Sequence, residues 1–232
     1  MIRRWIFWFA VFFGLYVLLP FLAPVFMHIG WYGAGNALYF VYSFLCHQLP
    51  ERSYFLFGSK ISYTIPEIQA AWQDTLNPLI LRQFIGNALM GWKVAWSDRM
   101  VSMFTGIWVL GLLWWPARKR IKPLPFWGLL LLIHPLALDG TTHLISDFAG
   151  IGLGFRSTNL WLSSLTHNIF APTFYAGDAW GSFNAWMRLM TGLSFSLGVV
   201  WFGFPYLDAA FGNTYEKEEL YEPSKNPGLV SR

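Results

Sequence analysis

Long stretches without a charged side chain constrain this chain more than any other feature of its sequence. Residues 5–50, 100–117 and 189–207 contain no Asp, Glu, Lys or Arg. About 20 apolar residues in an α-helix cross the roughly 30 Å hydrocarbon core of a bilayer, and a helix satisfies its own backbone hydrogen bonds there. We therefore expect an integral membrane protein built from helices.

The composition agrees with this expectation. Hydrophobic residues make up 55% of the chain and charged residues 12%, which is about half the charge of an average soluble domain. The net charge of +4 could suit nucleic acid, but the cations mark the borders of apolar segments. We expect a multi-pass protein of the cell membrane whose partner is the lipid bilayer, with no nucleic acid. The single cysteine, Cys46, excludes an intrachain disulfide.

The fold class that follows is all-α, a polytopic transmembrane helical bundle of about five spans plus interfacial helices. A single domain covers residues 1–212, and residues 213–232 form a polar, flexible tail. Residues 66–83 read as interfacial amphipathic helix, and residues 148–187 as short interfacial or re-entrant helices. The expected spans are residues 5–28, a second segment ending near 46, and residues 100–117, 126–147 and 189–207.

A cluster of cations gives the strongest orientation signal. Arg118, Lys119, Arg120 and Lys122 lie in a short loop, which places that loop in the cytoplasm. Arg3-Arg4 would place the amino terminus there too, and this requires an even number of intervening spans, whereas the pattern gives three. Either the first two segments form a re-entrant or half-crossing pair, or the amino terminus lies outside against its charges.

Polar residues interrupt the end of the 126–147 segment. On a helix, Asp139, His143 and Asp147 lie on one face, drifting about 40° per step. At 1.5 Å per residue, Asp139 is about 24 Å beyond Pro123. This stripe should therefore lie toward the membrane face opposite the basic loop.

The expected topology brings polar residues from four helix ends to that same face. We expect a polar pocket where they converge. The segments are 46–48, 97–99, 139–147 and 187–188.

The run from Cys46 to Ser53, Cys-His-Gln-Leu-Pro-Glu-Arg-Ser, resembles the opening motif of the prokaryotic membrane-protein family catalogued as domain of unknown function 2085. The resemblance covers roughly residues 40–200. It continues, in the family's order, through residues 99–106, Asp139-Gly140, residues 157–159, and Arg188 with Thr191-Gly192.

The chain departs from the family pattern in one segment. Ser97-Asp98-Arg99-Met100 stands where the family usually has Cys-x-Arg-Cys, so a shared thiolate metal site is in doubt. The family has no assigned activity, and the resemblance implies a class and candidate positions. Together with the converging helix ends, it gives a candidate polar pocket, ligand-binding or structural, formed by Cys46, His47, Gln48, Arg52, Ser97, Asp98, Arg99, Asp139, His143, Asp147, Asn159 and Arg188.

Asp139 must be paired, neutral or hydrated, because an ionised Asp near mid-bilayer costs about 2.5–3.5 kcal/mol on insertion scales. One hypothesis is a structural salt bridge to Arg99 or Arg188. A second is a divalent-metal site from Asp139 and His143, which have suitable ligand types at i, i+4. Asp147 or His47 would complete that site. A third is a headgroup or small anion held between the cations Arg99, Arg156 and Arg188.

Two adjacent pairs have simpler interpretations. Cys46 and His47 could form a thiol–imidazole nucleophile, but neighbours on a helix point about 100° apart. A polar helix end is the favoured interpretation. Glu51 and Arg52 are expected to be a surface pair worth under about 1 kcal/mol.

The leading hypothesis is a non-enzymatic binding component, or a subunit of a membrane complex, that uses this pocket and needs no cofactor. One alternative is a membrane-embedded hydrolase with a divalent metal on Asp139 and His143. Another is a transporter of small ions or polar solutes, although we find no repeated halves in the sequence.

Overall fold

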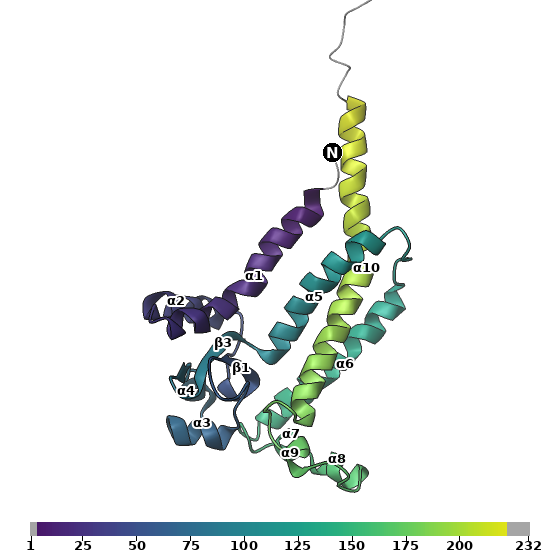
Figure 1. Ribbon diagram of the computed structural model, residues 1–232. Helices are drawn as coiled ribbons and strands as arrows, with labels where there is room; N and C mark the ends of the chain where they lie inside the picture. Colours follow the sequence, from purple (N-terminus) through teal and green to yellow (C-terminus); the bar gives the residue numbers. More distant parts are fainter. Residues whose placement is uncertain (1–3, 222–232) are drawn as a thin grey trace, which may run out of the picture.

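A computed structural model describes residues 4–221, with side chains described over residues 5–211. Within that range four helices are long and apolar enough to cross a membrane (Figure 1). They are α1 (Arg4–His28), α5 (Asp98–Ala117), α6 (Phe126–Asp147) and α10 (Phe183–Tyr221). The apolar part of α10 ends at Phe211. The protein is thus mostly helical, with candidate membrane spans.

The expectation of five spans is wrong at the second segment. Helix α2 (Tyr32–Ser43) has only 12 residues, well below the roughly 20 that a span needs. It folds back beside α1 after a turn at Gly30, whose φ of +84° suits glycine. Two candidate spans, α1 and α5, therefore separate the amino terminus from the basic loop, and the count becomes even. Arg3 lies outside the described residues.

The fold is mostly helical, as expected, but not all-α, because the described residues also include one small three-stranded antiparallel sheet in the order β1-β3-β2. Its strands are β1 (Ser53–Leu56), β2 (Gly86–Asn87) and β3 (Gly91–Ser97). Strand β3 is rich in aromatic and β-branched residues, which favour a buried strand. Ser53 of β1 pairs with Ser97, the last residue of β3. Helix α5 begins at the next residue, so the sheet leads directly into α5.

Short helices complete the part of the chain between α2 and α5, and the segment between α6 and α10. Pro66 at the start of α3 and a capping box between Thr64 and Glu67 begin that helix, as expected for an amphipathic segment. The elements are η1 (Pro50–Arg52), α3 (Ile65–Ala71), α4 (Pro78–Leu81), α7 (Phe155–Thr158), α8 (Leu160–Leu165) and α9 (Pro172–Tyr175).

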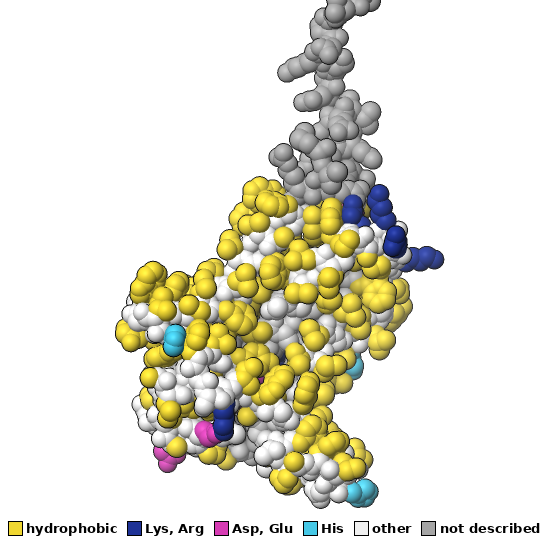
Figure 2. Space-filling view, in the orientation of Figure 1, with side chains coloured by type: hydrophobic (Ala, Val, Ile, Leu, Met, Phe, Trp, Pro, Cys, Tyr) yellow, Lys and Arg dark blue, Asp and Glu magenta, His cyan; other side chains and the backbone are white. Residues whose placement is uncertain are grey.

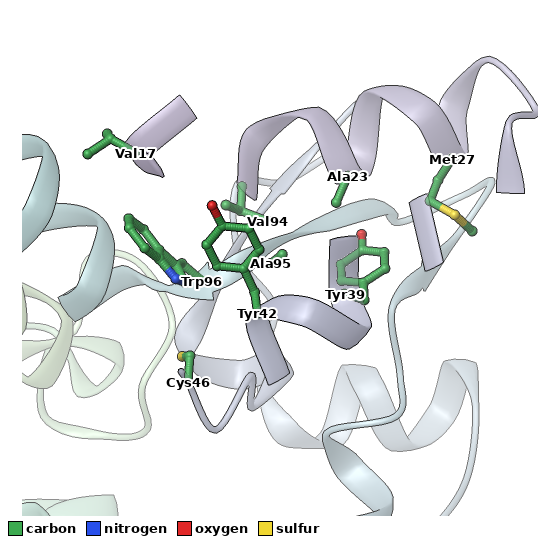
Figure 3. Close-up of a cluster of buried hydrophobic side chains, with 9 residues drawn as sticks. All are labelled: Val17, Ala23, Met27, Tyr39, Tyr42, Cys46, Val94, Ala95 and Trp96. Carbon is green, nitrogen blue, oxygen red and sulfur yellow. The ribbon is translucent and has the colours of Figure 1, made fainter. Parts of the chain in front are cut away.

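The sheet is anchored to α1 and α2 by a buried cluster (Figure 3). Trp96 of β3 is fully buried and stands edge-on to Tyr42 of α2. The Tyr39 hydroxyl donates to the backbone carbonyl of Lys93 at 2.5 Å. This packing fixes the end of β3, and hence the first turn of α5.

Helices α5 and α10 pack closely through small residues. A Cβ on Gly192 would lie 2.0 Å from Ser102 Oγ, and one on Gly106 would lie 2.5 Å from Ser196 Oγ. Close approach at small residues is typical of helix pairs in membranes. The start of α10 is therefore held against the start of α5.

The surface of the helical part is largely apolar, and Lys and Arg side chains gather at the end where α5 meets α6 (Figure 2). The sheet and α7–α9 lie at the opposite end (Figure 1). Helix α10 continues to Tyr221, so residues 213–221 of the expected tail are helical. Residues 222–232 lie outside the described residues.

Candidate functional site

A network of charged side chains fills the end of the bundle away from the basic loop. Within residues 5–211 it joins four arginines to four aspartates drawn from six parts of the chain. Its members are Arg52, Asp98, Arg99, Asp139, Asp147, Arg156, Asp178 and Arg188. Equal numbers of each charge allow these groups to be buried together, because an unpaired charge in a low-dielectric interior is costly.

Asp139 of α6 is shared by two arginines. One carboxylate oxygen accepts from Arg99 Nη2 of α5 at 2.6 Å, and the other accepts from Arg156 Nη2 of α7 at 2.6 Å. Arg156 Nη2 also lies 3.1 Å from His143 Nε2. Two arginines thus neutralise Asp139. The ion pair with Arg99 agrees with the hypothesis of a structural salt bridge. The alternative partner, Arg188, bonds elsewhere.

Arg52, which follows α2 and sits in η1, connects α6 to the loop after α9. Its Nη1 and Nη2 donate to the two oxygens of Asp147 at 2.7 and 2.8 Å, the bidentate geometry for which guanidinium is suited. Its Nε donates to Asp178 at 3.0 Å. Burial would lower the pKa of Arg52, but Asp178 and Asp147 outweigh it and raise the pKa above its usual range.

Arg188 makes the corresponding connection between the first turns of α10 and α5. Its Nε lies 2.9 and 2.8 Å from the two oxygens of Asp98. Its Nη1 donates to the Asp178 carboxylate at 2.7 Å and its Nη2 to the Asp178 backbone carbonyl at 2.6 Å. Burial would raise the pKa of Asp178, yet Arg52 and Arg188 together hold it well below its usual range.

The sequence-predicted residues surround a cavity of about 290 Å³, which we call the polar cavity. It lies where the two halves of the network meet. Nine of the twelve predicted residues line it: Cys46, His47, Arg52, Ser97, Asp98, Arg99, His143, Asp147 and Arg188.

Two groups that line the polar cavity carry buried donors without a partner among the described residues. Arg99 Nε is one, and His143 Nδ1 is the other. Arginine can only donate, so His143 Nε2 accepts from Arg156 and the ring proton lies on Nδ1. The His143 side chain is only 5% exposed. A buried donor without an acceptor costs about 1–3 kcal/mol, so the buried ion pairs are assembled at some cost in stability at these two atoms.

His47 adds a third donor to the lining. Its Nδ1 accepts from the backbone N–H of Leu49 at 3.0 Å, so in the neutral ring the proton lies on Nε2. His47 is an exposed residue, yet desolvation by the surrounding protein and the cations Arg52 and Arg188 hold the pKa of His47 below its usual range. The shift favours the neutral ring.

Cys46 and His47 have separate partners. Cys46 is buried, and its Sγ accepts from the backbone N–H of Ser97 at 3.3 Å. Its thiol therefore connects the residues after α2 to the start of α5, in keeping with the favoured interpretation of this segment as a polar end.

The other three predicted residues lie outside the polar cavity lining. Asp139 accepts a hydrogen bond from Arg99, which does line the polar cavity. The Gln48 side-chain amide donates to the Tyr39 carbonyl at 2.9 Å. Asn159, with φ of +43°, donates to the carbonyls of Arg156 and Tyr175 at 2.7 Å each, so it shapes the loop that carries Arg156.

The expectation of a surface pair at Glu51 and Arg52 is wrong, because both are buried. Neither Glu51 carboxylate oxygen has a hydrogen-bond partner among the described residues, and burial raises the pKa of Glu51 to about 7 despite Arg52. Lys93 of β3 is fully buried as well and donates to the carbonyls of Gln48 and Arg82 at 2.7 Å each. Burial lowers the pKa of Lys93 to about 7.

Two members of the network are absent from the predicted pocket list. Asp178 lies after α9 in a segment without periodicity, and Arg156 entered only as a candidate anion ligand. One signal was available: Arg156 and Asp178 are the only charged residues in 148–187. An isolated charge in a segment packed against membrane helices needs a partner.

The metal hypothesis does not fit the side chains as they are arranged. The described residues contain no group of three or more His, Cys, Asp or Glu that could hold a metal ion. His143 Nε2 lies 3.9 Å from Asp139, with Arg156 donating to both. A divalent cation would have to displace two arginines from Asp139.

Comparison with known proteins gives one distant relative. Over 141 residues the chain is 29% identical to the uncharacterized protein MJ1492 of Methanocaldococcus jannaschii, and the match spans 57% of this chain and 69% of the archaeal protein. No family model and no solved structure matches the chain. The similarity shows distant homology and assigns no activity.

Proposed function

We propose that this protein is a multi-pass protein of the cell membrane whose polar cavity binds a small anionic group, a phosphate or a carboxylate. One observation carries the proposal: the polar cavity is lined by Arg52, Arg99 and Arg188 together with two histidines, and the Arg99 side chain keeps 22% of its surface exposed. The chain would act as a binding component, alone or as a subunit of a membrane complex. We also place it in the family of domain of unknown function 2085, supported by the motif that begins at Cys46.

The charge distribution favours an anion next to Arg99. In the Arg99, Asp139 and Arg156 group, two cations share one carboxylate, so this group carries one net positive charge. The other half of the network, two arginines and three aspartates, carries one net negative charge, so the anion is expected beside Arg99 and away from Asp98 and Asp147. In a site with restricted water, charge-assisted hydrogen bonds are stronger than in bulk solvent. An anion at this position would accept from the exposed part of the Arg99 guanidinium and from His47 Nε2.

The membrane placement follows from the helix count. With α1, α5, α6 and α10 as the four spans, the basic loop after α5 lies in the cytoplasm, and the amino terminus lies on the same side. The polar cavity then faces the opposite side of the membrane. An even number of spans between the amino terminus and the basic loop supports this proposed placement.

Cys46 provides a direct test, because it lines the polar cavity and is the only cysteine in the chain. In purified protein in detergent, the rate of Cys46 modification by a small methanethiosulfonate reagent is measured with and without inorganic phosphate, using chloride at matched ionic strength. We expect phosphate to slow modification several-fold. Arg99→Gln should abolish this protection, whereas Arg120→Gln in the basic loop should retain it.

The comparison separates binding from general salt effects, because both variants remove one positive charge. A rate that is unchanged by phosphate, sulfate and acetate would refute the proposal. Equal protection in the wild type and Arg99→Gln would also refute it. On the described residues, no observation favours a hydrolase or a transporter over a binding component.

A further inference from the structure

A second, larger hollow adjoins the same ion pairs and is not used by the proposed function. This groove has a volume of about 740 Å³ and lies between α6, α7, α8 and α10. Its size is within the roughly 300–1,000 Å³ typical of pockets that enclose an organic ligand. The apolar part of its lining comprises Leu138, Phe155, Leu160, Trp161, Phe183 and Met187.

The groove has one charged end. Asp139 and Arg156 both line it, and the Arg156 side chain is only 8% exposed. The Arg156 guanidinium lies over the Phe183 ring at 5.4 Å, while its Nε has no hydrogen-bond partner among the described residues. Because Asp139 is already shared with Arg99, the positive charge of Arg156 is only partly balanced.

The rim of the groove is apolar and exposed. Leu138 is 53% exposed and Leu160 is 68% exposed. Leu138 belongs to α6 and Phe183 to α10, both candidate spans, so in a bilayer this rim meets lipid. A ligand that enters here must combine an apolar body with a negative group, which describes a phospholipid better than a soluble anion.

We propose that this groove binds a membrane phospholipid, with its phosphate at Arg156 and an acyl chain along the apolar wall formed by Leu138, Trp161 and Met187. The accessible part of the Arg156 guanidinium would donate to a phosphate oxygen, and the apolar wall would replace neighbouring lipid around the chain. The two hollows meet the ion pairs through different arginines, Arg156 in the groove and Arg99 in the polar cavity, although these two arginines share Asp139 and its one surplus positive charge.

The test measures binding of three probes to purified, delipidated protein in detergent by native mass spectrometry and thermal shift. Phosphatidylglycerol carries both phosphate and chains, diacylglycerol carries chains alone, and glycerol 3-phosphate carries phosphate alone. The groove variant is Leu138→Trp, which fills the hollow from an exposed position and leaves the ion pairs intact. The matched control is Leu131→Trp, two turns earlier on α6, 73% exposed and outside the lining.

We expect phosphatidylglycerol to bind the wild type and Leu131→Trp equally, and Leu138→Trp at least about tenfold more weakly. Each partial probe should bind the wild type more weakly than phosphatidylglycerol, and diacylglycerol should also bind Leu138→Trp more weakly than the wild type. Equal phosphatidylglycerol affinity in Leu138→Trp and Leu131→Trp would overturn the proposal. So would diacylglycerol binding as tightly as phosphatidylglycerol. Neither result bears on phosphate protection of Cys46, so the two proposals fail separately.

Discussion

Asp139→Asn is the most informative single change, because Asp139 is fully buried between two cations. Asparagine keeps the size of the side chain and removes the charge that accepts from Arg99 and Arg156 at 2.6 Å each. Removing one partner of a buried ion pair costs about 3–5 kcal/mol. The Arg99 side chain is 22% exposed and can regain some hydration, so we expect about 3 kcal/mol.

For a chain of this length, about 3 kcal/mol corresponds to a decrease in Tm of about 6–12 °C. Thermal unfolding in detergent is followed by the reaction of Cys46 with a thiol-reactive fluorophore, since Cys46 is the only thiol and is buried. Far-ultraviolet circular dichroism measured in parallel separates global unfolding from local opening near Cys46.

Two aspartates serve as controls for this prediction. Asp147→Asn should lower Tm less, because Arg52 keeps its bond to Asp178 and the Asp147 side chain is 22% exposed. Asp74→Asn, at an exposed position that accepts from Gln69, should leave Tm unchanged. If Asp139→Asn has a Tm within error of Asp74→Asn, the assignment of Asp139 as the buried centre of the ion pairs is refuted.

Three further predictions concern other parts of the chain. Burial raises the pKa of Glu51 from 4.5 to about 7, so the folded state binds this proton more tightly than the unfolded state. The free energy of unfolding should therefore fall by about 3 kcal/mol as the pH rises from about 4.5 to 7. In Glu51→Gln, Tm should depend less on pH over this range, and a pH dependence of Tm equal to that of the wild type would contradict the argument. Gly192→Val should lower Tm by several degrees, because its Cβ would clash with Ser102. The control is Gly203→Val, whose Cβ meets open space. Equal Tm values for the two variants would contradict the close packing of α5 against α10. In the Cys46→Ser background, Lys119→Cys and an amino-terminal tag should both be labelled from the cytoplasmic side of membrane vesicles, and labelling from opposite sides would exclude the four-span topology.

The long helices could be predicted from the sequence because hydropathy alone decides them. The charge-free segments at 100–117 and 189–207 lie within α5 and α10. The same rule failed for residues 5–50. It counts consecutive uncharged residues and does not detect where a helix ends, so it missed that α2 has only 12 residues. The sheet was missed because β1 and β2 have four and two residues, too few for a clear alternation of apolar and polar residues.

Part of the site could also be predicted from the sequence. The i, i+4 spacing from Asp139 to Asp147 predicts one helix face, and counting residues along the spans places that face beside the start of α5. Asp178 could not be found in this way, because it lies in a loop whose position depends on tertiary packing. The burial of Glu51 was missed for a related reason: a neighbouring acid and base in sequence resemble a solvated pair, and only the fold shows that η1 is enclosed.

The ion pairs also set an order of assembly during synthesis of the chain. Arg99 and Asp139 are 40 residues apart and belong to neighbouring helices, so they can pair as soon as the α5–α6 hairpin has entered the bilayer. Asp98 must wait for Arg188, 90 residues later, and Arg52 for Asp178, 126 residues later. Until residues 178 and 188 have been made, Arg52 and Asp98 lack these partners. Helix α10 thus brings the partner of Asp98, and the loop before it brings the second partner of Arg52, long after both residues have been made.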